Sequence, residues 1–90
     1  MIDTSKGFIV EYILQCYYQD EGYKVIKTDH FDKYTQAKQH AIQAAKQSRR
    51  DAWIGTGTGN YDGEYIAKVT EDGQVSVIND KVKHCDWINE

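Results

Sequence analysis

Residues 32–50, DKYTQAKQHAIQAAKQSRR, decide the fold, because their hydrophobic period and their composition both predict an α-helix. On a wheel of about 3.6 residues per turn, one side of this helix is mostly alanine. That side carries Tyr34, Ala37, Ala41, Ala44, Ala45 and Ser48. Small side chains let the helix axis lie close to a sheet built from the flanking segments. We expect Asp32 to be the N-cap, and we expect His40, on the opposite side, to be solvated.

The segment before the helix predicts a long β-hairpin. Residues 8–18 place large side chains alternately on two faces, a period of two that is typical of a strand. Residues 19–22 (QDEG) predict a turn, and residues 23–28 (YKVIKT) return as a second strand. This hairpin supplies the first two strands of the sheet.

The segment after the helix predicts three shorter strands, at residues 52–54, 64–70 and 75–78. The second of them places Tyr65, Ala67 and Val69 on one side. The Asp72-Gly73 pair before the last strand predicts a type I′ hairpin turn. Residues 79–90 contain enough apolar side chains to form a docked tail or a short extra strand.

These segments predict an α+β domain in the order ββαβββ, with a single α-helix on a four- to five-stranded antiparallel sheet. Ninety residues make one domain, residues 1–90, with its core at about residues 7–78. One helix covers one face of such a sheet. The opposite face is therefore available to water or to a partner.

The charge is divided unevenly along the chain. Five of the eleven Lys and Arg residues fall within residues 33–50, where no acid occurs, so the net charge of -3 combines a basic helix with an acidic body. No run of apolar residues predicts a membrane span or a signal peptide, so we expect a cytoplasmic protein. In that compartment we expect Cys16 and Cys85 to be reduced.

No motif for catalysis, metal binding or a cofactor passes a spacing test. Gly55-x-Gly57-x-Gly59 follows a strand, but no helix and no Gly-Lys-Ser/Thr follow it, so it predicts a bulged hairpin loop rather than a phosphate site. His84-Cys85 matches no zinc-finger spacing. Paired carboxylates occur in turns, where acids are common. We therefore expect a protein that is not an enzyme and that holds no metal or cofactor.

The composition indicates a binding surface instead. Eleven aromatic residues, seven of them tyrosine, exceed what one helix can cover, and tyrosine is enriched in interfaces. Acidic turns could dock on a basic groove of a partner protein or protein complex. The candidate partner-binding residues are Tyr17, Asp20, Glu21, Trp53, Asn60, Tyr61, Asp62, Glu64, Glu71 and Asp72.

Two alternatives stay open. The basic helix could bind nucleic acid through Lys38, Lys46, Arg49 and Arg50, although the wheel gives these residues no continuous stripe and the acidic body would repel phosphates. The open sheet face could instead form a homodimer, in which case the aromatic residues are structural. We expect no membrane partner.

The order of elements resembles a known group of proteins. The quoted features are FD at residues 31–32, TQAK at 35–38, WI at 53–54 and KVTEDG at 68–73. In this pattern the chain resembles small phage and mobile-element proteins, and among them the anti-CRISPR type with one helix on an antiparallel sheet. The resemblance implies a non-catalytic inhibitor that binds a subunit of a host protein complex that targets nucleic acids, and it implies the host cytoplasm as its location if a phage encodes the chain. It assigns no functional residue.

Overall fold

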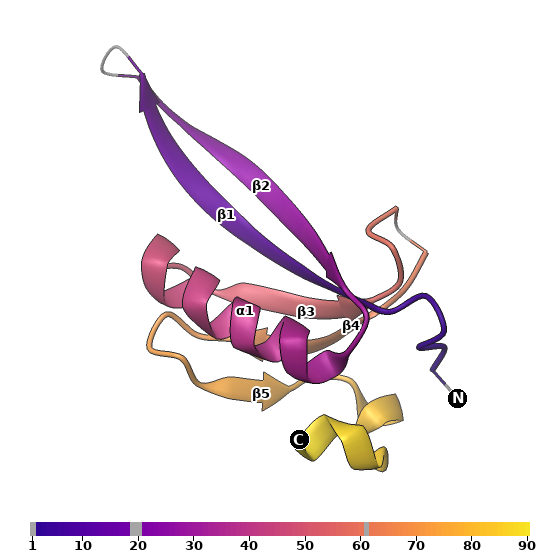
Figure 1. The fold of residues 1–90 in the computed structure, drawn as a ribbon. Coiled ribbons are helices and arrows are strands. Elements are labelled where there is room, and N and C mark those ends of the chain that lie inside the picture. The colour runs from indigo at the N-terminus through magenta and orange to yellow at the C-terminus, as the bar shows by residue number, and fades with distance from the viewer. Residues whose placement is uncertain (1, 19–20, 61) are drawn as a thin grey trace.

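The computed structural model describes residues 2–18, 21–60 and 62–90, with side chains described at 2–14, 25–60 and 62–90. Over these residues the chain forms one α-helix and a five-stranded antiparallel sheet, in the order β2-β1-β3-β4-β5 (Figure 1). This confirms the predicted α+β fold and the order ββαβββ. None of the helices in the described part has the length and apolar character needed to cross a bilayer.

The five strands are β1 (Phe8–Tyr18), β2 (Glu21–Phe31), β3 (Ala52–Thr56), β4 (Tyr65–Val69) and β5 (Val75–Val77). Strand β1 pairs with β2 along its whole length, but it pairs with β3 only from Phe8 to Tyr12. Beyond Tyr12 the hairpin therefore continues as a two-stranded arm that leaves the body of the sheet (Figure 1). Strand β2 is three residues longer at its C-terminal end than the sequence predicts.

Helix α1 (Tyr34–Ser48) begins one residue later than predicted. Its N-cap is Lys33, whose extended backbone carries no side-chain cap, so the assignment of Asp32 as N-cap is wrong. Strand β2 continues to Phe31. The next two residues, Asp32 and Lys33, are therefore needed to link the strand to the helix. The helix ends where Arg49 adopts a left-handed backbone conformation with φ 57°.

The alanine side of α1 is buried against the sheet, as predicted. Ala37, Ala41 and Ala45 are fully buried, and the helix packs on β1 and β3. On the sheet side, Val10 and Ile54 belong to the same hydrophobic cluster. Since alanine removes most of the side-chain layer, the helix backbone lies close to the sheet and little room remains for larger residues at these positions.

The C-terminal segment docks as 3-10 turns rather than as a strand. They are η1 (Asp80–Val82) and η2 (Asp86–Asn89), and they bury Val82 and Ile88 in the core. Trp87 packs edge-to-face on both Phe8 and Tyr34, with ring centroids 5.2 Å apart in each pair. The tail thus closes the end of the layer between α1 and the sheet. Cys85, in the same segment, is a half-buried free thiol.

Two local predictions on the C-terminal side of the sheet are wrong. The ladder between β3 and β4 is irregular between Ile54 and Gly55, where a bulge leaves Tyr65 opposite Gly55 while Ala67 lies opposite Ile54. Tyr65 is consequently exposed, whereas Ala67 is buried, so these two residues do not share one side of β4 as predicted. The hairpin between β4 and β5 is also not of type I′, because Arg49 is the one non-glycine residue of the described chain with positive φ. A type I′ turn needs positive φ at both central residues, whereas in this hairpin only Gly73 has positive φ.

Tyr34 carries a buried hydroxyl with no hydrogen-bond partner among the described residues. We expect Tyr34→Phe to keep the ring contacts and to raise the free energy of unfolding by about 1 kcal/mol, because an unsatisfied polar group is removed. Burial also raises the pKa of Tyr34. The parent chain should therefore lose stability as the pH rises above about 10, where the unfolded tyrosine ionises first.

Urea unfolding at pH 7 and at about pH 11 measures both effects. The Tyr34→Phe variant should lose less stability than the parent over this interval. An equal loss in both proteins would show that the Tyr34 hydroxyl does not carry the alkaline sensitivity.

Candidate functional site

The face of the sheet that α1 leaves uncovered contains a groove of about 420 Å³. Ile9, Thr28 and Gly55 form its floor on three adjacent strands. Ile26 and Tyr65 stand at its sides, with 63% and 45% of their surface exposed. Large apolar side chains exposed to this extent beside a hollow are typical of surfaces that bind other molecules.

Carboxylates surround this apolar floor. Glu11, Asp62 and Glu64 line the groove, and none of its lining residues that the structure describes is a lysine or an arginine. The Glu11 carboxylate accepts a 2.8 Å hydrogen bond from the Tyr65 hydroxyl, which is a neutral donor. Glu64 pairs with Lys81 at 2.8 Å, and both side chains are substantially exposed. The groove therefore has three carboxylates around its floor, of which Glu64 and Asp62 each have a lysine partner and Glu11 is bonded to a neutral hydroxyl.

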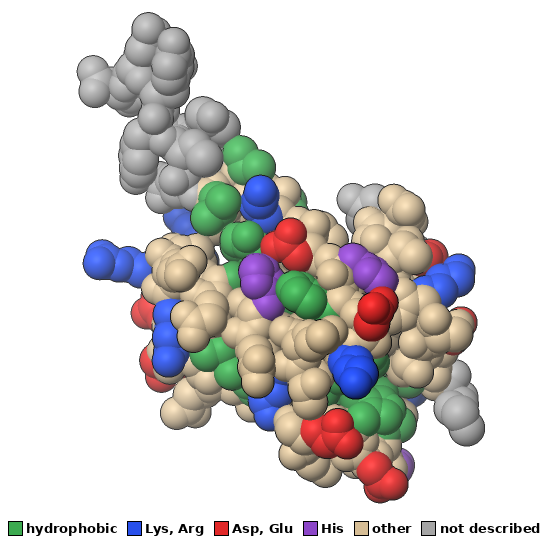
Figure 2. Space-filling view, in the orientation of Figure 1, with side chains coloured by type: hydrophobic (Ala, Val, Ile, Leu, Met, Phe, Trp, Pro, Cys, Tyr) green, Lys and Arg blue, Asp and Glu red, His purple; other side chains and the backbone are tan. Residues whose placement is uncertain are grey.

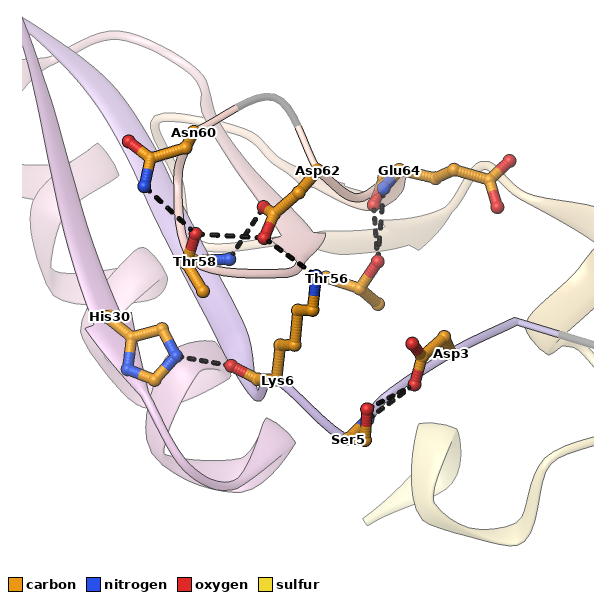
Figure 3. Close-up of polar contacts among 9 residues, drawn as sticks. All are labelled: Asp3, Ser5, Lys6, His30, Thr56, Thr58, Asn60, Asp62 and Glu64. Atoms are coloured by element: carbon orange, nitrogen blue, oxygen red, sulfur yellow. Dashed lines mark hydrogen bonds and ion pairs between the residues drawn. The ribbon is translucent and has the colours of Figure 1, made fainter.

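One wall of the groove is the glycine-rich loop between β3 and β4, and Asp62 holds the described part of this loop in place (Figure 3). Its carboxylate accepts hydrogen bonds from the backbone N–H and from the hydroxyl of Thr58, each at 2.9 Å. It also lies 3.5 Å from the Lys6 ammonium group. The bond from the Thr58 N–H, then that from its hydroxyl, lowers the pKa of Asp62.

The loop lies close to the sheet because glycine leaves space for the approach. A Cβ atom added at Gly59 would be 3.1 Å from Cγ2 of Thr28, on strand β2. Gly59 also has φ 97°, which side chains rarely tolerate. Gly59 thus allows the loop to pack against the sheet, where the sequence predicted a bulged hairpin loop rather than a phosphate site.

Four of the predicted partner-binding residues lie at or near the groove. Asp62 and Glu64 line it. Asn60 donates a hydrogen bond to the Thr58 hydroxyl within the loop (Figure 3). Trp53, on β3, is half-buried and pairs across the ladders with Glu11 and Lys68.

Two of the other predicted residues lie away from the groove. Glu71 and Asp72 are exposed in the turn between β4 and β5. There the Thr70 hydroxyl donates to Asp72 and lowers the pKa of its carboxyl. Tyr17 and Glu21 have backbone positions at the far end of the arm, but their side chains lie outside the described residues, as do Asp20 and Tyr61 altogether.

The basic residues of the helix have separate surroundings. The Lys38 ammonium group donates to the Glu90 carbonyl at 2.9 Å. Lys46 lies beside Gly73, near Asp72. Arg49 is the helix C-cap, and Arg50 is half-buried. In Figure 2 the Lys and Arg side chains are separated by uncharged and apolar ones.

His40 is not simply solvated, and this prediction is wrong. Its Nε2 atom lies 2.8 Å from the Asp29 carboxylate on β2. Its ring also packs against Phe31 and Tyr12, with centroids 5.0 Å and 5.9 Å apart. A shallow hollow of about 520 Å³ lies beside it, bordered by three glutamines of α1, Gln36, Gln39 and Gln43. His40 thus attaches the outer side of the helix to the hairpin.

The sequence missed the groove residues Ile9, Glu11, Ile26 and Tyr65. Alternation along β1 does place Ile9 and Glu11 on one face, which was the available signal. Their proximity to Ile26 and Tyr65 depends on the order of strands in the sheet and on the bulge beside Gly55. Neither feature is encoded in local periodicity.

Across the described part of the chain, no three His, Cys, Asp or Glu side chains are grouped so that they could hold a metal ion. The chain matches no protein-family model, no curated protein and no solved structure.

Proposed function

We propose that this chain is a non-catalytic protein-binding module that holds its partner in the groove on the uncovered face of the sheet. One observation carries the proposal: an apolar floor with the exposed side chains of Ile26 and Tyr65 is surrounded by three carboxylates. Apolar contact at the centre and charge at the edge is the usual anatomy of a protein interface.

The charge of the groove favours a basic partner surface. Positive surfaces are characteristic of proteins that bind nucleic acid, since they neutralise phosphates. A module that covers such a surface would exclude the nucleic acid by occupying its site. We therefore propose an inhibitor of a host complex that targets nucleic acids, of the anti-CRISPR type that the sequence pattern resembles.

Affinity capture with groove variants tests this proposal. The tagged chain is incubated with bacterial lysate, with and without nuclease, and the recovered protein is quantified. We expect Ile26→Ala to weaken capture by about thirtyfold, as for an exposed apolar anchor of about 2 kcal/mol. Glu11→Gln, which removes charge but keeps shape, should weaken it several-fold and make it less dependent on salt.

The chain offers a matched control for each variant. Ile78 is 51% exposed but lies outside the groove, and Glu71 is an exposed acid in a distant turn. Ile78→Ala and Glu71→Gln should leave capture unchanged. Loss of capture in these controls with retention in the groove variants would place the interface elsewhere. A partner that disappears after nuclease treatment would favour nucleic-acid binding instead.

A further inference from the structure

Strand β2 is an edge of the sheet, and we propose that it pairs with β2 of a second copy of this chain. The strand order places β2 at one end, with β1 as its partner on one side. It has eleven residues and a continuous register with β1, and it contains no proline. A long, regular edge of this kind exposes backbone groups that can bind another strand. This inference does not depend on the function proposed above.

The ladder shows which backbone groups of β2 are free to pair. The Gly57 N–H donates to the Gly7 carbonyl, so in the register of β1 and β3 the odd residues of β1 bond to β3. The even residues of β1 therefore bond to β2, where their partners are the odd residues Lys27 and Asp29. The N–H and C=O groups of Ile26, Thr28 and His30 consequently face outward from the sheet.

The sequence of this edge is self-complementary in one register. A two-fold axis perpendicular to the sheet makes β2 antiparallel to its copy and keeps both helices on the same side. With Thr28 opposite Thr28 of the second copy, Lys27 lies opposite Asp29, and this pair occurs twice. Val25 then lies opposite Phe31. The neighbouring register, centred on Lys27, would oppose two lysines and is disfavoured.

The side chains of the charged pair are positioned for this contact. Lys27 is exposed, and 39% of the Asp29 side chain remains accessible although His40 lies on it. Because α1 packs on β1 and β3, the two helices would be separated by at least three strand spacings, about 14 Å. Packed helices need only about 8 to 10 Å, so the helices do not clash.

The paired segment has seven residues in each chain, 25–31, so the interface is smaller than that of a typical stable dimer. We expect a reversible, concentration-dependent dimer, measured by sedimentation equilibrium of the full chain. Lys27→Asp or Asp29→Lys replaces two attractions with two repulsions and should weaken dimerisation about tenfold or more. Mixing the two variants should restore a dimer, because each heterodimer regains two opposite-charge pairs.

A backbone variant tests the same edge independently of charge. Thr28→Pro removes an outward N–H that the monomer does not use in its sheet, whereas Thr28→Val keeps it. The proline variant should be monomeric and the valine variant dimeric, with circular dichroism confirming that each is folded. A parent chain that stays monomeric at millimolar concentration would overturn the inference. A dimer that persists in both Lys27→Asp and Thr28→Pro would also overturn it.

Discussion

Ile54→Ala is expected to lower the free energy of unfolding by about 3 kcal/mol, whereas Ile26→Ala should lower it by about 0.5 kcal/mol or less. The two substitutions remove the same atoms. Ile54 is fully buried on β3 beneath the helix, and Ile26 is 63% exposed on β2. Removing a buried side chain costs both its transfer from water and the cavity that remains.

The expected loss at Ile54 is a large fraction of the stability of a domain of this size. Equilibrium unfolding in urea, followed by circular dichroism, measures both variants against the parent. The pair also separates stability from binding: Ile26→Ala should fail in the capture experiment while it remains as stable as the parent. Similar losses of stability at both positions would contradict the assignment of the buried and open faces.

Gly63→Ala is expected to destabilise the chain by about 3 kcal/mol and to disrupt the groove. A Cβ atom added at Gly63 would overlap the carbonyl oxygen of Thr56 and would lie 2.8 Å from its hydroxyl oxygen. The clash is with backbone, which cannot move aside without breaking the bonds between Thr56 and Glu64. In these bonds the Thr56 N–H donates to the Glu64 carbonyl at 2.8 Å, and the Glu64 N–H donates to the Thr56 hydroxyl at 3.1 Å.

Gly73→Ala provides a control with a different physical cause. Gly73 has φ 91°, but its added Cβ atom would meet only the flexible end of Lys46 and a methyl group of Ile42. Its cost should be the conformational one, about 1 to 2 kcal/mol, and the groove should keep its partner. Urea unfolding and capture of both variants test this difference. A Gly63→Ala variant that unfolds like the parent would show that the loop can move away from β3.

Part of the candidate site follows from local sequence. Alternation identifies Glu11 as a residue on one face of β1, and the turn-rich segment after β3 identifies Asp62 and Glu64. The arrangement of these residues around a groove does not follow from local sequence, because β1, β2, β3 and the loop come from separate segments of the chain. For the same reason Glu71 and Asp72, which look equivalent to Asp62 in sequence, lie in another part of the molecule.

The sequence by itself determined the order of elements and the buried side of the helix. Both depend on short-range periodicity, since alanine at about every third or fourth position can bury one side of a helix only. The tertiary structure decided the late start of α1, the bulge that exposes Tyr65, the contact of His40 with Asp29 and the docking of Trp87. These features depend on contacts between residues distant in the chain, and packing selects among local conformations that the sequence permits equally.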